Sequence, residues 1–181
     1  MIYVVSHDPA WAAKFELEAA RIKAAAAEAI VRIHHIGSTA IPRIKAKPII
    51  DILLEVASLD ALDRKTPALE ALGYEAKGEF GISGRRYFRR DDAAGRRTHQ
   101  IHAFAAGVPD VTRHIAFRYY MRAHPLTAEE YSALKERLAH EYPHDMDAYM
   151  DGKDLFVKEQ ERHALLWAIL AKAAPAARSG D

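Results

Sequence analysis

Hydrophobic residues near the N-terminus recur at helical spacing and then give way to two strand-like runs. Asp8 can cap a helix, and Pro9 suits its first position. The apolar positions that follow at helical spacing are Trp11, Phe15, Ile22, Ala26 and Ile30. Residues 31–36 (VRIHHI) predict a short strand. Residues 47–56 (KPIIDILLEV) predict a strand covered on both faces, because they are almost continuously apolar.

The middle of the chain combines one more helix with further strands. Residues 58–73 predict a helix that ends at its terminal glycine, Gly73. Residues 74–80 are a candidate strand. Residues 85–104 have the pattern of a hairpin, because two strand-like runs flank the turn-rich segment DDAAG.

Everything after Gly107 has a helical pattern. Pro109 opens one helix, and a last helix is expected from about Lys153. Thr127 and Glu130 have the spacing of a capping box, which predicts the start of a helix between these two. An N-terminal helix, a mixed sheet and a helical C-terminal third together indicate an α+β or α/β fold.

Composition excludes several classes of protein. The chain has 181 residues, half of them hydrophobic, which suits one domain with a sizeable core. It has no cysteine, which excludes disulfides and thiolate zinc sites and fits a reducing compartment. Lys and Arg number 26 against 25 Asp and Glu, so overall charge gives no case for nucleic acid or a membrane surface. With no signal peptide pattern and no apolar run of about 20 residues, we expect a soluble cytoplasmic protein.

A lone acid in the apolar run 47–56 is the first candidate for chemistry. Strand alternation places Asp51 on the same face as Leu53 and Glu55, where an unpaired buried carboxylate is costly. The preceding Gly37-Ser38 pair offers backbone N–H groups and a hydroxyl that can cradle a phosphate. Together these residues could hold a nucleoside triphosphate and its magnesium ion. The alternative is an ordinary turn and a structural acid bonded to the backbone or to Lys47.

Five motifs give the chain a resemblance to a known family: HIGSTAIPRIKAKPIIDILLEV, GISGRRYFRR, THQIHAF, HIAFRYYMRAHP and YMDGKDLFVKE. Together with the opening DPAWAAKFELEAARI, they resemble the GrpB-like proteins from about residue 6 to residue 170. That family is similar to the nucleotidyltransferase superfamily, with its polymerase-beta-like fold. We expect a nucleotidyltransferase-like α/β core at 1–107, C-terminal helices at 108–174 packed on it as one compact unit, and a flexible tail at 175–181. Some relatives are fused to dephospho-coenzyme A kinase, which implies a functional link to that enzyme.

The superfamily pattern places two strand acids, two residues apart, after the Gly-Ser pair. Gly37, Ser38 and Asp51 match the pattern, but the second acid falls at Leu53. Positions two apart on a strand lie ~7 Å apart, close enough to share metal ions, whereas Asp51 and Glu55 lie ~13 Å apart. Leu53 therefore argues against a two-metal phosphoryl transfer.

Histidine is the candidate for the third acid of the superfamily. The strand THQIHAF places Gln100 and His102 on one face. If this strand lies beside Asp51, His102 can serve as a zinc or manganese ligand or as a general base. His99 has the opposite direction, and we interpret it as a surface or core residue. Asp51 and His102 are thus the predicted catalytic and metal-binding residues.

Basic residues provide the candidate phosphate contacts. Alternation puts Arg86 and Arg90 on one face of the RRYFRR strand and Arg85 and Arg89 on the other. Any single cation here can equally be a solvated charge offset by nearby acids, and a short run of arginines and aromatics is only a weak indication of RNA stacking. Motif membership favours some cations above the rest. With Gly37 and Ser38, the predicted ligand-binding residues are Lys47, Arg86, Arg118 and Lys153.

Two functions follow from these residues. The first is a nucleotide-binding enzyme that transfers a nucleotidyl or phosphoryl group to an unknown acceptor, with magnesium or manganese, or zinc, as a divalent cofactor. The second is a non-catalytic module that binds a phosphometabolite or coenzyme A precursor, having lost transfer chemistry with the acid at Leu53. Neither function requires nucleic acid or a membrane.

Overall fold

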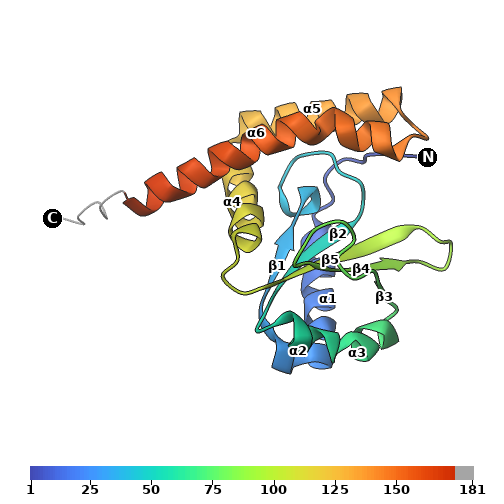
Figure 1. Ribbon diagram of the computed structural model, residues 1–181. Coiled ribbons are helices and arrows are strands. Elements are labelled where there is room, and N and C mark those ends of the chain that lie inside the picture. The colour runs from blue at the N-terminus through green and yellow to red at the C-terminus, as the bar shows by residue number, and fades with distance from the viewer. Residues whose placement is uncertain (174–181) are drawn as a thin grey trace.

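The computed structural model describes residues 1–173, and the predicted tail at 175–181 lies outside them. Its centre is a five-stranded sheet in the order β1-β2-β5-β4-β3 (Figure 1). The β2–β5 pair is parallel and the other pairs are antiparallel, so the sheet is mixed and the fold is α+β, as predicted. The strands are β1 (Ile30–Ile36), β2 (Ile50–Val56), β3 (Glu75–Ala76), β4 (Arg86–Asp91) and β5 (Arg97–Ala105).

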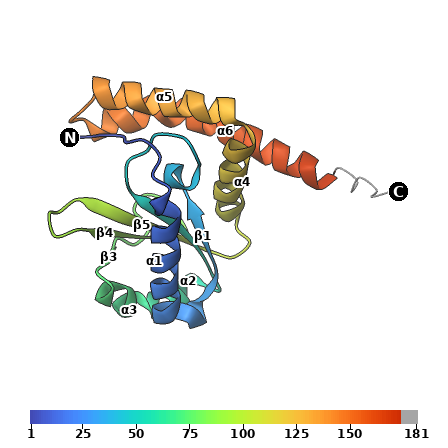
Figure 2. The ribbon, with the colours of Figure 1, turned by 180° about the vertical axis from the view of Figure 1, so that it is seen from behind.

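One face of the sheet carries the main hydrophobic core. Helices α1 (Ala10–Ala26), α2 (Leu59–Asp63) and α3 (Thr66–Ala71) cover this face (Figure 2). As predicted, α1 buries its stripe of apolar side chains, and Asp8 Oδ1 accepts a hydrogen bond from the N–H of Ala10 at 2.9 Å. The predicted strand acid Asp51 has its aliphatic neighbours Ile50 and Ile52 in this core.

The C-terminal helices are α4 (Pro109–Ala123), α5 (Pro125–Glu141) and α6 (Met146–Ala173), and of these α4 packs on the other face of the sheet. Figures 1 and 2 show α5 and α6 side by side above the sheet, with α4 descending from them toward it. Ile41 and Ile44 pack against Met121, Ala128 and Tyr131 of α4 and α5. The C-terminal helices are therefore fastened onto the loop that joins β1 to β2.

Several element boundaries differ from the sequence-based expectation. The single helix expected at 58–73 is two helices, because Pro67 has no N–H with which to continue the ladder of α2. The strand expected at 74–80 shortens to two residues. The predicted capping box is absent, since α5 begins with Pro125 at its first turn and no side chain caps it.

The last helix begins seven residues earlier than expected. Asp145 Oδ1 accepts a hydrogen bond from the N–H of Ala148 at 3.0 Å, which satisfies a donor at the start of α6. Gly152 lies inside this helix, where a Cβ would come within 2.4 Å of Leu138 of α5. Gly152 therefore allows α6 to approach α5 closely, and it does not mark the start of the helix. Within residues 1–173, no helix is both long and apolar enough to cross a membrane.

Candidate functional site

The turn at Gly37 lies directly against the carboxylate of Asp51. Antiparallel pairing sets Ile36, the last residue of β1, opposite Asp51. Gly37 has a φ of +70°, and a Cβ at this position would lie 2.5 Å from Asp51 Oδ2. Only glycine combines that backbone conformation with such a close approach. The Asp51 side chain remains 25 % exposed, so the carboxylate can reach a ligand from solvent.

His102 lies on the same face of the sheet as Asp51. The parallel register pairs Leu53 with His102, and His102 Nε2 is 3.7 Å from Asp51 Oδ1. On its other side, His102 Nδ1 is 3.4 Å from Arg85 Nη1. The histidine is thus oriented from both sides.

Lys135 of α5 completes the Gly-Ser turn. Its Nζ donates a hydrogen bond to Ser38 Oγ at 2.9 Å and another to the carbonyl oxygen of Lys45. The side chain is buried, with only 3 % of the residue exposed. Burial, followed by repulsion from Lys153 and Lys47, lowers the pKa of Lys135 to about 7. The ammonium group is therefore held in a site that disfavours its charge.

Lys47 and Lys153 supply two more cations beside Lys135. Their Nζ atoms lie 5.3 and 5.8 Å from the centre of the Tyr149 ring. Burial lowers the pKa of both lysines, and the Asp51 carboxylate acts in the opposite direction on each. Within residues 1–173, these three lysines form no ion pair; the paired lysines are Lys14, Lys45, Lys65, Lys77 and Lys158. Three neighbouring ammonium groups thus meet near Ser38 and Asp51 without a carboxylate bound to them.

Arg86 and Arg118, two of the predicted ligand-binding residues, lie elsewhere. Arg86 points to the opposite face of the sheet, where its guanidinium binds both carboxylate oxygens of Asp63 at 2.7 and 2.8 Å. Arg118 is buried in α4 and donates to the carbonyl oxygen of His35 at 2.7 Å. Both guanidinium groups are therefore engaged with the protein itself, and the structure does not bring them to Asp51.

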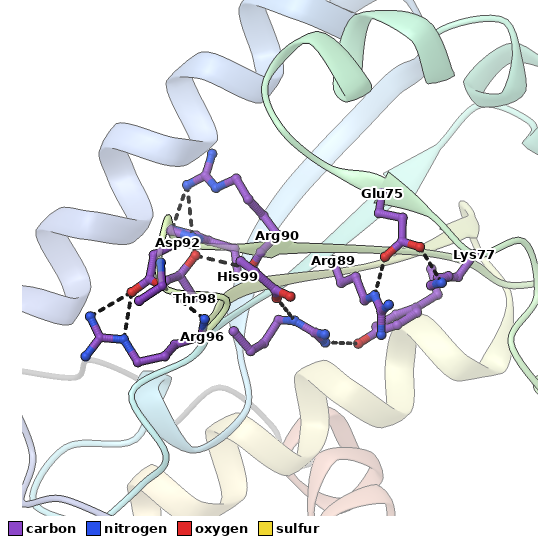
Figure 3. Close-up of polar contacts among 12 residues, drawn as sticks. Glu75, Lys77, Arg89, Arg90, Asp92, Arg96, Thr98 and His99 are labelled. Carbon is purple, nitrogen blue, oxygen red and sulfur yellow. Dashed lines mark hydrogen bonds and ion pairs between the residues drawn. The ribbon is translucent and has the colours of Figure 1, made fainter.

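The other arginines of β4 also have protein partners. Figure 3 shows Arg89 beside Glu75 and Lys77, and Arg90 beside His99. The Arg90 guanidinium also binds the buried carboxylate of Glu18 in α1, at 2.7 Å. These contacts fasten the β4–β5 hairpin to the elements that surround it. His99 is a half-buried residue on the face away from Asp51, and burial lowers its pKa to about 4.

The described surface hollows are lined by other residues than Asp51 and His102. One is lined by residues 141–147, at the turn between α5 and α6. The other is lined by residues 42–44 with residues of α4 and α5. Asp51 and His102 line neither of them, and they meet solvent beside the Gly37 turn.

Lys135 is the site residue that the sequence interpretation missed. It occupies a helical stripe whose other members are buried: Ala128, Tyr131, Leu138 and Ala139. A lysine on the apolar face of an amphipathic helix must place its charge somewhere inside the fold. The place of Lys135 in this apolar stripe was the signal in the sequence that could have identified it as a buried cation.

A divalent ion would find a limited set of protein ligands here. The 3.7 Å between Asp51 Oδ1 and His102 Nε2 is close to the separation of two ligands on one ion. In the described part of the chain, no group of three His, Cys, Asp or Glu side chains could hold a metal ion. Leu53 is fully buried against Ile36, Phe104 and Val111, so the second acid of the superfamily has no counterpart. The residues suit one ion with two protein ligands and not a two-metal clamp.

Comparison with known proteins identifies close relatives. The chain is 43% identical over 166 residues to the UPF0157 protein YqkA of Bacillus subtilis. The aligned region covers 92% of this chain and 48% of YqkA. It is 41% identical to the conserved protein GrpB of Enterococcus faecalis, whose crystal structure superposes with a TM-score of 0.87 over 92% of this chain and 99% of that one. A dephospho-CoA kinase of Mycolicibacterium paratuberculosis is 29% identical over 92% of this chain and 47% of the kinase. The chain thus spans about half the length of YqkA and of this kinase.

More distant structures share the fold. Terminal uridylyl transferase 4 from Trypanosoma brucei with bound dUTP has a TM-score of 0.52 at 12% identity, over 81% of this chain and 52% of that chain. The Cid1 poly(U) polymerase has a TM-score of 0.52 at 13% identity, over 82% of this chain and 49% of that chain. The sequence model of the GrpB protein family matches residues 1–163. The chain therefore belongs to the GrpB family, and its fold is that of the nucleotidyltransferases.

Proposed function

We propose that this protein binds a nucleoside triphosphate, with the phosphates beside Ser38 and the three lysines Lys47, Lys135 and Lys153. The unpaired ammonium cluster carries the proposal. Three half-buried or buried cations repel one another, and a polyphosphate would relieve that repulsion while accepting several charge-assisted hydrogen bonds. The fold supports the same ligand, because the uridylyl transferase and Cid1 structures that share it contain dUTP and 3'-dATP.

Asp51 and His102 define the reacting end of this site. Both side chains lie on the face that carries the Gly37 turn, and they face each other at 3.7 Å. If an ion binds, Asp51 and His102 would hold it, and it would supply positive charge next to the phosphates. Manganese or zinc suits a carboxylate–imidazole pair better than magnesium does.

Transfer of a nucleotidyl or phosphoryl group is the reaction that these residues could support. The lysines would neutralise charge on the phosphates, which is the main electrostatic requirement of phosphoryl transfer. His102 would accept the proton of an attacking hydroxyl, and Asp51 would stabilise the resulting imidazolium. The acceptor would approach from the exposed side of Asp51.

The second candidate is a non-catalytic module that binds a phosphometabolite or coenzyme A precursor. Leu53 favours this candidate, because a buried leucine replaces the acid that would complete a metal pair. The dephospho-CoA kinase relatives suggest coenzyme A precursors and a functional link to that kinase as the biological setting. The two candidates share one phosphate site and differ only in whether the ligand reacts.

Binding is tested by thermal unfolding with each of the four nucleoside triphosphates, in magnesium, in manganese and in EDTA. We expect at least one triphosphate to raise the melting temperature by several degrees. Lys135→Met and Asp51→Asn should reduce this shift. Lys158→Met is the matched control, because this exposed lysine of α6 already pairs with Asp154. The absence of a shift in every combination would refute nucleotide binding.

Transfer is tested separately by the leaving group: pyrophosphate is released in nucleotidyl transfer, and the nucleoside diphosphate is released in phosphoryl transfer. Release that depends on His102 and Asp51 supports the enzyme. Binding without release, in the presence of cell-derived small-molecule acceptors, supports the module. The two functions are thus distinguished by product and not by affinity.

A further inference from the structure

The connection between β3 and β4 is an unusually constrained loop. Gly78, Gly81 and Gly84 all have positive φ, between 60° and 83°. Phe80 lies among them with a φ of +46°, a conformation that costs a side-chain-bearing residue roughly 1–2 kcal/mol. The Phe80 side chain is also exposed, at 59 % of the residue. The fold therefore tolerates both strain and an exposed aromatic ring at one position.

Arg85 holds this loop in place. Its guanidinium is buried and donates to the carbonyl oxygen of Phe80 at 2.6 Å and to that of Glu79 at 3.1 Å. Glu79 Oε1 in turn accepts a hydrogen bond from the N–H of Gly84 at 2.7 Å. The same guanidinium reaches His102 Nδ1 at 3.4 Å. One arginine thus joins the aromatic loop to the proposed reacting end of the site.

The Phe80 ring extends an aromatic surface away from His102. It stacks on the ring of Tyr87, with centroids 5.0 Å apart and planes 18° from parallel. The Tyr87 ring lies 5.4 Å from that of His102, on the face of the sheet shared by Asp51. One face of the Phe80 ring therefore stacks on Tyr87, and the other face is exposed to solvent. The phosphate contacts at Ser38 lie on the other side of Asp51.

We infer that the open face of Phe80 stacks on the base of the bound nucleotide. The inference rests on the proposed nucleotide binding. It assigns a contact to the base, which is the part of the ligand that the lysines do not bind. A flat aromatic surface presents no hydrogen-bond code, so it accepts purines and pyrimidines and binds the larger purine more strongly. The hydrogen bonds of Arg85 to the loop and the stacking on Tyr87 hold the ring in place in advance, which reduces the entropy lost when the base binds.

The test compares ATP with inorganic triphosphate as probes in titration calorimetry. Stacking on an aromatic side chain contributes about 1–3 kcal/mol per base, so Phe80→Ala should weaken ATP binding roughly 5- to 150-fold. It should leave the affinity for inorganic triphosphate within about twofold. Phe80→Tyr should retain ATP binding. Alanine also carries a Cβ, so the substitution adds no backbone strain at +46°.

Ile82→Ala is the matched control, because Ile82 is an exposed apolar residue of the same loop. It should leave both affinities unchanged. Equal affinity of wild type and Phe80→Ala for ATP would overturn the inference and leave nucleotide binding intact. An equal loss for ATP and inorganic triphosphate would also overturn it, because the effect would not come from the base. If the wild-type protein binds neither probe, the proposed function fails with it.

Discussion

Lys135 gives the most quantitative prediction, because its burial must appear in the pH dependence of stability. Its pKa falls from 10.5 to about 7 in the native protein, mainly through burial. Between these two values the unfolded chain binds a proton that the native protein has lost. The contribution of Lys135 to the free energy of unfolding therefore rises with pH from about 7 upward. This contribution is lowest below pH 7. The slope approaches ~1.4 kcal/mol per pH unit.

Substitution by methionine removes this titration and keeps most of the side-chain volume. We expect the wild type to gain about 2 kcal/mol relative to Lys135→Met between pH 7 and pH 9, since the wild-type lysine is half protonated at the start of that range. Urea unfolding at pH 6, 7, 8 and 9 measures the difference directly. Lys158→Met should show no such change relative to wild type, because Lys158 is exposed and its pKa is raised. Parallel pH profiles for wild type and Lys135→Met would refute the assignment of a buried, destabilised ammonium group.

The same titration predicts how ligand binding depends on pH. A polyphosphate beside Lys135 favours the charged lysine, so binding near pH 7 to 8 should take up protons. Calorimetric binding enthalpies measured in buffers of different ionisation enthalpy report this uptake. The affinity of the wild type should fall as pH rises above 7, and Lys135→Met should lose the proton uptake. Proton uptake that is unchanged in Lys135→Met would place the titrating group elsewhere.

Three further substitutions test the geometry of the site. Gly37→Ala forces a Cβ against a carboxylate oxygen at 2.5 Å, whereas Gly95→Ala has a similar φ of +74° and meets nothing within 4 Å; thermal unfolding should show a larger loss for Gly37→Ala, and equal losses would contradict the close contact. Leu53→Asp should lower the free energy of unfolding by several kcal/mol without creating a metal site, because the position is sealed, while Leu53→Met should cost less than about 1.5 kcal/mol. Arg86→Ala should leave triphosphate affinity unchanged and cost at most about 1 kcal/mol of stability, because its partner Asp63 is largely exposed; a large loss of affinity would show that Arg86 reaches the ligand.

Local patterns predicted the elements whose signals are local. The stripe from Trp11 to Ala26, the apolar run before Val56 and the turn-rich hairpin all appear in the structure as predicted. The start of α6 was expected seven residues too late, and Gly152 inside this helix has a non-local role. Its missing side chain makes room for Leu138 of another helix, and nothing in the sequence around Gly152 reports that contact.

The part of the site that depends on the alternation of side chains along β2 and β5, and on the pairing of these two strands, could be predicted. Asp51 and His102 share a face because the parallel β2–β5 pairing sets Leu53 opposite His102. In β4, Tyr87 pairs with His102, and Arg85, which directly precedes this strand, contacts His102 on the same face. That register is a tertiary property, and without it motif membership favoured Arg86, which lies on the opposite face.

The buried charged side chains on the two sides of the sheet have different kinds of partner. On the α1 face, buried charge is matched: Arg90 meets Glu18 at 2.7 Å, with His99 beside them. Lys135 of α5 is buried as well, but its partners are a hydroxyl, a carbonyl oxygen and the ring of Tyr131, and it has no carboxylate partner. Pairing offsets the desolvation cost of a buried charge, whereas a buried charge without a counter-ion keeps that cost unless something outside the protein completes the pairing. The surroundings of each cation, which the sequence does not show, separate the paired Arg90 from Lys135, whose lack of a carboxylate partner is the basis of the proposed phosphate site.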